Sequence, residues 1–240
     1  GVRQLRGAGR AAVETVHAVR KEGFRVIPGF ALHVLRQAQR YRAGFRWVGQ
    51  DAHGVDETAF ARIVTRLAES AVDALGVLGS TGSYAWLSRE QRMQVIRQAK
   101  SHAGAVPLMA GIGALGTDRV LRLAEDAQRA GANALLLPAI AYQPLTEEEI
   151  FAFYQTVTRE VSVPVCVHDN PVTTHVTTSD ALKGAIAALP GIASIKIPGP
   201  AKNDVARRVQ SLRRQLPAEV TIGISGDACA ADGLNAGCEV

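Results

Sequence analysis

The segment ALLLPAIAYQPLTEEEIFAFYQTVTREVSVPVCV, residues 134–167, contains the structural unit from which the rest of the fold is inferred. It begins with the apolar run Ala134–Leu137 and ends with the apolar run Val163–Val167, and each run has the length of a buried parallel strand. Between them, Thr146 begins Thr-Glu-Glu-Glu, a capping-box pattern that predicts the start of a helix. The segment therefore predicts a strand–helix–strand unit.

The same unit recurs along the chain from about residue 56 onward. Ser88 begins a second capping-box pattern, Thr117 and Ser179 are expected helix N-caps, and Gly131 is an expected helix stop. Amphipathic segments lie between six apolar runs, at Val72–Gly79, Val106–Ala110, Ala134–Leu137, Val163–Val167, Ile192–Ile195 and Val220–Ile224. Strands that alternate with helices predict an α/β fold with a parallel sheet covered by helices.

Two α/β architectures fit this alternation, an open doubly wound sheet and a closed (β/α)8 TIM barrel. No GxGxxG fingerprint opens the first helix, which disfavours the dinucleotide-binding version of the open sheet. Polar residues instead follow many of the strands, as a TIM barrel requires at the end where its active site is built. These residues are Ser80-Thr81, Tyr142, His168, Lys196 and Ser225-Gly226-Asp227. We therefore expect the barrel.

The barrel is expected to be incomplete, because six of its eight strands are visible in the sequence. The first strand should lie before Asp56, where Phe24–Ile27 is a weak candidate, and the last strand is missing. Ala11–Glu22 has the spacing of a helix. We divide the chain into an atypical basic N-terminal segment, residues 1–50, and a C-terminally truncated TIM-barrel lyase domain, residues 51–240.

Composition restricts the class of protein. The chain has 240 residues, of which 47% are hydrophobic and 20% charged, as expected for a globular protein with a sizeable core. It contains no apolar run long enough for a transmembrane helix and no secretory h-region, so we expect no membrane association. Three cysteines without CxxC spacing argue against a disulfide framework or a zinc site and favour the cytoplasm.

The positive charge is concentrated at the N-terminus. Residues 1–50 hold nine arginines and Lys21 against two glutamates, a net charge of +8, whereas the whole chain carries +5. Such an arm raises the hypothesis of nucleic-acid contact. However, no stacking aromatics are interleaved with the arginines, and no helix-turn-helix or RNP-like motif is present. We therefore expect no nucleic-acid partner.

Lys196 is the strongest candidate for chemistry. The chain has five lysines and twenty-two arginines, so a lysine on the apolar run Ile192–Ile195 calls for an explanation. A buried amine has a lowered pKa and can attack a ketone, whereas an arginine cannot form a Schiff base. A strand-end lysine whose ammonium reaches solvent is the alternative.

Other polar residues offer supporting chemistry. The Gly79-Ser-Thr-Gly-Ser83 loop can bind a small anion such as a carboxylate, although an ordinary turn explains it equally well. Tyr142 is a candidate proton relay or aromatic lid, and His168 can exchange protons or can simply be hydrogen-bonded at a strand end. His102 and His175 lack metal-ligand spacing, so we expect no metal and no cofactor.

Taken together, these residues resemble the dihydrodipicolinate synthase / N-acetylneuraminate lyase family of class I aldolase-like enzymes, over about residues 50–240. The resemblance rests on ordered motifs: Gly79-Ser-Thr-Gly, Val106–Gly113 with Thr117, His168-Asp-Asn-Pro171, Ile195-Lys196 and Ser225-Gly-Asp227. It implies a (β/α)8 barrel in which Lys196 forms a Schiff base with pyruvate or a related 2-oxo acid. The resulting enamine then forms or breaks a bond to an aldehyde. The resemblance is also compatible with a homo-oligomer.

The resemblance also implies roles for other residues. Ser80 and Thr81 would hold the substrate carboxylate with help from the backbone at Gly226, and Tyr142 would belong to a proton relay linked through Ser80. His168 stands where the family has its catalytic tyrosine. Ser83 stands where the family often has an acidic residue.

The sequence leaves the reaction open. Val172-Thr173-Thr174 stands where the synthases of the family have an arginine for the carboxylate of the second substrate. The resemblance therefore argues against condensation with aspartate semialdehyde. The sugar-acid lyases and dehydratases of the family remain alternatives. A further hypothesis is an inactive relative that binds a small acid or serves as an interaction protein.

Overall fold

A parallel sheet of seven strands, arranged in the order in which they occur in the chain, dominates the structure. The computed structural model describes residues 30–31, 55–70, 72–80, 84–200, 204–226 and 229–239. The strands are β1 (Phe30–Ala31), β2 (Ala74–Val77), β3 (Leu108–Gly111), β4 (Ala134–Leu137), β5 (Val165–His168), β6 (Ile192–Pro198) and β7 (Thr221–Ser225). A doubly wound sheet would reverse its strand order at a switch point, and this order has no reversal.

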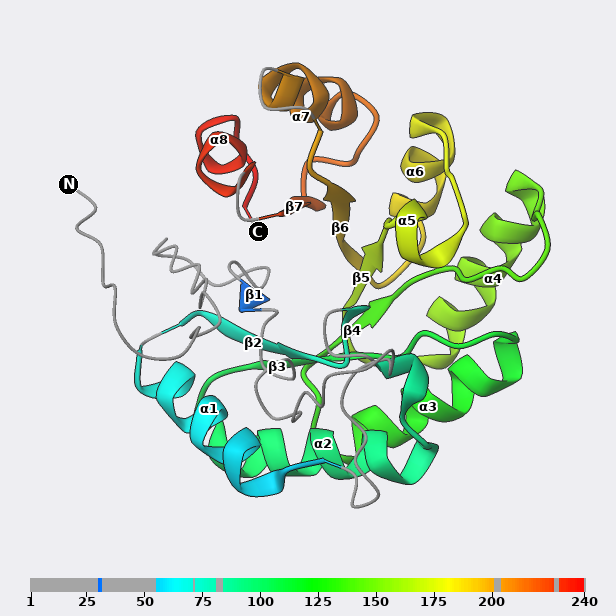
Figure 1. Ribbon diagram of the computed structural model, residues 1–240. Coiled ribbons are helices and arrows are strands. Elements are labelled where there is room, and N and C mark those ends of the chain that lie inside the picture. Colours follow the sequence, from blue (N-terminus) through cyan, green and yellow to red (C-terminus); the bar gives the residue numbers. More distant parts are fainter. Residues whose placement is uncertain are drawn as a thin grey trace, which may run out of the picture.

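The sheet is curled, with helices around its outer side (Figure 1). The helices of the structure are α1 (Glu57–Glu69), η2 (Tyr84–Trp86), α2 (Arg89–His102), α3 (Thr117–Arg129), α4 (Glu147–Glu160), α5 (Pro171–Thr174), α6 (Asp180–Ala187), α7 (Val205–Arg213) and α8 (Ala230–Asn235). Among the described residues, no helix is both long enough and apolar enough to cross a membrane. The architecture is that of a partial TIM barrel.

Each of the six predicted apolar runs overlaps a strand. Two of the strands begin later than predicted, after Pro107 and Pro164, because a proline has no N–H to donate to the ladder. The structure also has a strand before Asp56, because Phe30–Ala31 pairs in parallel with β2. The candidate strand Phe24–Ile27 and the helix predicted at Ala11–Glu22 lie outside the described residues.

Helix starts follow the predicted capping chemistry with one exception. Ser88 and Thr146 both make complete capping boxes, and the Ser179 hydroxyl accepts a hydrogen bond from the Leu182 amide. The prediction that Thr117 is an N-cap is wrong, because Gly116 occupies that position and Thr117 is the first helical residue. Gly116 has φ of +86°, which a β-branched threonine rarely adopts.

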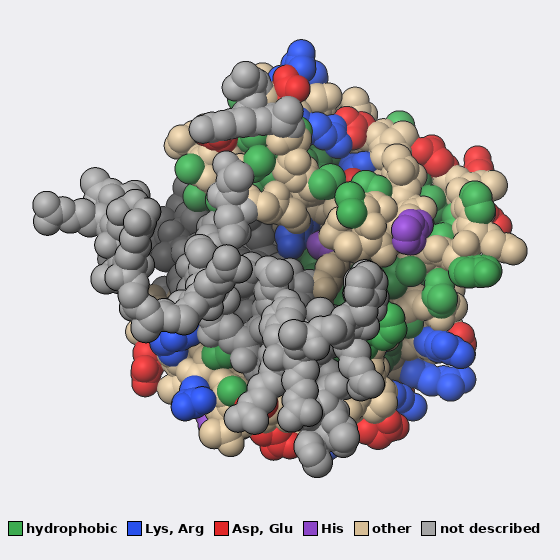
Figure 2. All heavy atoms as spheres, in the orientation of Figure 1, with side chains coloured by type: hydrophobic (Ala, Val, Ile, Leu, Met, Phe, Trp, Pro, Cys, Tyr) green, Lys and Arg blue, Asp and Glu red, His purple; other side chains and the backbone are tan. Residues whose placement is uncertain are grey.

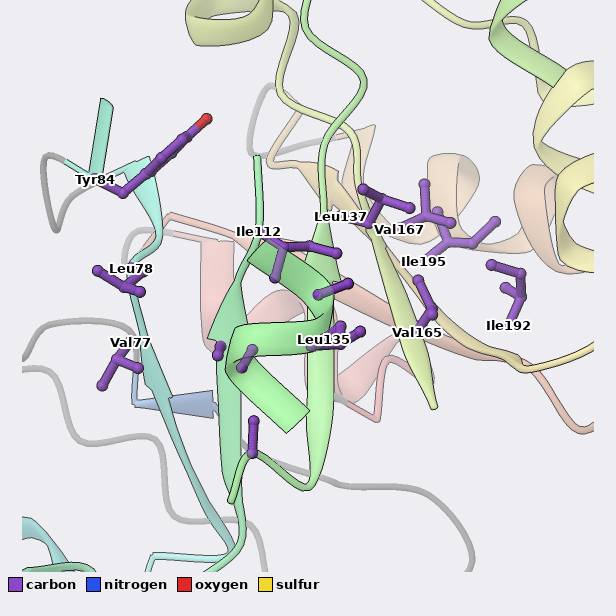
Figure 3. Close-up of a cluster of buried hydrophobic side chains, with 14 of the residues drawn as sticks. Val77, Leu78, Tyr84, Ile112, Leu135, Leu137, Val165, Val167, Ile192 and Ile195 are labelled. Carbon is purple, nitrogen blue, oxygen red and sulfur yellow. The ribbon is translucent and has the colours of Figure 1, made fainter. Parts of the chain in front are cut away.

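Two apolar layers follow from the alternation of side chains along each strand. The larger layer lies between the sheet and the helices and includes Leu135, Val167 and Ile195, which extend from their strands in Figure 3. The smaller layer lies on the other face, inside the curl, and consists of Ala74, Met109, Ala134, Leu136 and Cys166. Polar side chains near the carboxyl ends of β5, β6 and β7 share this interior face.

Candidate active site

Lys196 lies on the interior face of the curled sheet, opposite His168. The two residues are register partners on the parallel strands β5 and β6. An irregularity between Val165 and Cys166 leaves Ala193 as an extra residue on β6, because Val165 pairs with Ile192 and Cys166 pairs with Ser194. Ile195 and Ile197 consequently pack toward the helices, and Lys196 faces inward. Lys196 was expected at a strand end, but β6 continues for two residues beyond it.

Burial controls the charge of Lys196. Its side chain is only 8% exposed, and desolvation of the ammonium lowers its pKa to about 8. The neighbouring Cys166 opposes this shift, but desolvation also raises the pKa of the Cys166 thiol to about 11. About a tenth of Lys196 is therefore the neutral amine at pH 7, and only the neutral amine is nucleophilic.

His168 is a neutral imidazole in this environment. Desolvation, with a smaller contribution from the positive charge of Lys196, lowers its pKa to about 3. Its Nε2 atom lies 3.4 Å from the Ser80 hydroxyl, a long hydrogen bond whose direction depends on the tautomer. Its Nδ1 atom is buried and has no hydrogen-bond partner. His168 can therefore relay a proton or hold one on a ligand, but it carries no charge at neutral pH.

Ser80 connects the loop after β2 to this pair. Its hydroxyl also lies 3.3 Å from the Thr173 hydroxyl of α5, so the contacts form a short chain, His168–Ser80–Thr173. The backbone just before Ser80 is constrained, because the buried Leu78 has φ of +60°. The Leu78 carbonyl lies against Gly111 of β3, where any Cβ atom would overlap it. The glycine in β3 thus permits the turn that presents Ser80.

The other predicted site residues have different placements. Tyr142 is 89% exposed, and the described contacts of the Ser80 hydroxyl are with His168 and Thr173. Gly226 directly follows β7 with φ of +100°, a conformation that suits glycine. Thr81 and Ser83 lie outside the described residues.

Sequence reasoning missed Thr173 as a partner of Ser80, and it missed a buried ion pair beside the site. Asp169 directly follows His168, and its carboxylate lies 3.0 Å from the ammonium of Lys183 on α6. The Asp169 amide also donates to the Lys196 carbonyl at 2.9 Å. The scarcity of lysine that draws attention to Lys196 applies equally to Lys183, but its partner lies fourteen residues away, beyond local sequence patterns.

Comparisons with known proteins show what this chain is similar to. The 4-hydroxy-tetrahydrodipicolinate synthase of Phenylobacterium zucineum is 31% identical over 174 residues, which are 72% of this chain and 58% of that protein. The synthase of Methylococcus capsulatus is 34% identical over 59% of this chain and 49% of its own length. The chain thus spans roughly half of the curated relatives that it matches.

A solved structure and a family sequence model also match this chain. The dihydrodipicolinate synthase of Agrobacterium tumefaciens superposes with a TM-score of 0.80 at 38% identity, over 89% of this chain and 68% of that one. The sequence model of the Dihydrodipicolinate synthetase family matches residues 49–240. The chain therefore belongs to the dihydrodipicolinate synthetase family.

Proposed function

We propose that the chain is a lyase in which Lys196 forms a Schiff base with pyruvate or a related 2-oxo acid. The observation that carries this proposal is the buried Lys196 amine, with a pKa of about 8, on the interior face beside His168. Membership of the family supports it, because the relatives described above are named as synthases of one kind. A structural lysine at a strand end would have an ammonium that reaches solvent, and that of Lys196 is desolvated.

The reaction begins with nucleophilic addition. The lone pair of the neutral Lys196 nitrogen attacks the ketone carbon, and a proton passes from that nitrogen to the carbonyl oxygen to give a carbinolamine. The carbinolamine hydroxyl then takes up a proton and leaves as water to give the protonated imine, and loss of a proton from the adjacent carbon gives the enamine. The enamine carbon forms a bond to an aldehyde in the synthetic direction. In the cleavage direction, the same bond breaks and the electron pair returns to the enamine.

The neighbouring residues manage protons and position the acid. His168, uncharged in this site, relays the proton between the carbinolamine oxygen and the Ser80 hydroxyl, which passes it toward Thr173. Ser80, Thr81 and the backbone at Gly226 hold the carboxylate. Tyr142 keeps its predicted place in the relay, although it is exposed in the structure.

Trapping with borohydride tests this function directly. The chain is incubated with pyruvate and with a panel of other 2-oxo acids, reduced with borohydride, and measured by intact mass. The proposal predicts one stable adduct per chain with at least one acid. If no acid in the panel gives an adduct, the proposal is contradicted. Stabilisation by an acid without an adduct would instead support the small-acid-binding alternative.

We also propose that the fold is an eight-stranded barrel. Glu239, which follows α8, bonds to the free side of β7. The Glu239 amide donates to the Ile222 carbonyl at 3.0 Å, and the Ile222 amide donates to the Glu239 carboxylate at 2.9 Å. These bonds support a strand that follows α8 and lies beside β7.

A further inference from the structure

The buried ammonium of Lys183 holds both ends of one loop. The loop spans residues 169–178, between β5 and α6, and it contains the short helix α5. The Lys183 Nζ atom lies 3.0 Å from the Asp169 carboxylate at the start of the loop, and it donates to the Thr178 carbonyl at 2.7 Å near the end. In the face that Figure 2 shows, charged side chains lie mostly toward the periphery, whereas Lys183 is only 3% exposed. A buried charge is costly unless it is paired, so the ammonium and the loop hold each other in place.

This loop determines where the two ends of the His168–Ser80–Thr173 chain lie. His168 directly precedes Asp169, and Thr173 lies on α5 within the loop. The Asp169 amide donates to the Lys196 carbonyl at 2.9 Å, which ties the start of the loop to the strand that carries the amine. The two contacts of the Ser80 hydroxyl, at 3.4 and 3.3 Å, are near the upper limit for a hydrogen bond, so a small displacement of the loop would break them.

The loop is also bonded to the segment that leads to Tyr142. The Ala141 amide donates to the Thr174 carbonyl at 3.2 Å. The buried Thr174 hydroxyl donates to the Asn170 carbonyl at 3.0 Å and accepts from the Val176 amide at 3.3 Å, so the loop is cross-linked within itself. A loop braced in this way moves as a unit, and its attachment to α6 through Lys183 therefore affects every contact that it makes.

An ion pair in this position is better suited to fixing geometry than to adding stability. Buried charges lose their hydration, so a buried ion pair stabilises a fold little more than apolar side chains of similar volume would. Charged hydrogen bonds are directional, however, and those of Lys183 fix where the loop lies relative to α6.

We propose that Lys183 is a positioning residue of the reaction and that, by holding both ends of the 169–178 loop, it keeps His168 aligned with Ser80 for proton transfer. This inference rests on the proposed function and adds to it a residue from the layer of helices. Lys183 acts through Asp169, the neighbour of His168 in the chain, and does not itself touch the 2-oxo acid.

The double variant D169N/K183M tests the proposal, because it removes the hold on the loop and leaves no charge unpaired. The full chain is incubated with saturating pyruvate, quenched with borohydride at a series of times, and measured by intact mass, while thermal unfolding checks that each variant is folded. We expect the double variant to form the adduct about tenfold more slowly than the wild type, because a misplaced relay loses much of its effect. In the H168F background, which has no relay to misalign, the same two changes should slow adduct formation less than about twofold.

The control is R89M/D126N, which removes an ion pair between α2 and α3 and should leave the rate unchanged in both backgrounds. A rate for the folded D169N/K183M variant within about twofold of the wild type overturns the proposal, as does an equal loss with and without His168, which is the result of a merely structural role. If the double variant does not fold, D169N alone is measured in both backgrounds and the same two outcomes decide. A wild-type chain that forms no adduct contradicts the proposed function itself, whereas the outcomes above contradict this inference alone.

Discussion

At the scale of single residues, burial shifts two neighbouring bases toward their neutral forms. Lys196 and His168 face each other on adjacent strands, and desolvation lowers the pKa of both. The positive charge of Lys196 further disfavours the imidazolium of His168. Lys196 therefore titrates within the accessible pH range, whereas His168 does not. The two groups consequently have separate effects on the pH dependence of the reaction rate.

The rate of adduct formation with pyruvate should therefore depend on the ionisation of Lys196 alone. Because the neutral amine is the nucleophile and its pKa is about 8, the rate should rise about tenfold from pH 7 to pH 9 and then level off. The pKa of His168, about 3, predicts no inflection near pH 6.5. Stopped-time borohydride trapping between pH 5 and pH 10 measures the profile, and an inflection near pH 6.5 would refute the assignment of a neutral His168.

Replacing His168 tests its role as a proton relay. H168F removes both ring nitrogens while keeping a ring of similar size, and we expect it to lower kcat about 100-fold because a general acid–base group is lost. H168Y restores a hydroxyl and should recover part of that loss. A rate within threefold of the wild type for H168F would show that the relay does not pass through this residue.

The burial of Lys196 could be predicted from sequence, whereas the contacts of its neighbours could not. A lone lysine on an apolar run is visible in sequence because the cost of burying an amine is local. The His168–Ser80–Thr173 chain depends on strand register and on the turn at Leu78, and neither can be derived from residue type. The loop position of Tyr142 suggested a proton relay or an aromatic lid, and the resemblance favoured the relay. Its exposure in the structure leaves that role a prediction.

At the scale of elements, the buried pair of Asp169 and Lys183 ties the end of β5 to α6. The two side chains are 9% and 4% exposed, and the Lys183 ammonium also donates to the Thr178 carbonyl at 2.7 Å. Because the Asp169 amide bonds to the Lys196 carbonyl, this pair fixes the segment that holds His168 beside Lys196. Such long-range pairs cannot be read from sequence, whereas the caps at Ser88, Thr146 and Ser179 could be, since each depends on neighbouring residues alone.

Removing one member of this pair should be costly. We expect K183M to lower the free energy of unfolding by about 3–5 kcal/mol, because it leaves a buried carboxylate without its partner. The double variant D169N/K183M should recover much of that loss, since it leaves no charge unpaired. Urea unfolding of the single and double variants measures the coupling, and additive losses would mean that the two side chains do not interact.

At the scale of the whole molecule, the helices pack onto one face of the sheet and the chemistry lies on the other. The repeat of strand and helix predicted this arrangement, because a parallel sheet must bury its faces. The strands then lie side by side in chain order, from β1 to β7. Strand β1 was not predicted at its observed position, because a strand of two residues has no periodicity to detect. The irregularity in β6 that turns Lys196 inward was equally invisible, since it depends on pairing with β5.

The layer between sheet and helices should carry most of the stability. L135A removes a fully buried side chain from this layer, and we expect it to lower the free energy of unfolding by about 2–5 kcal/mol through the cavity that it leaves. The matched control L115A changes a leucine that is 48% exposed and should cost less than about 1 kcal/mol. Thermal or urea unfolding compares the two, and equal losses would argue against this location of the core.

The most direct test of the central claim is to locate the reduced pyruvate adduct in the sequence. After borohydride trapping, peptide mass spectrometry should find the modification on Lys196, and K196A should yield no adduct. The matched variant K100A, which removes a lysine of α2, should keep the adduct. An adduct on another lysine, or one that persists in K196A, would contradict the assignment of Lys196 as the Schiff-base residue.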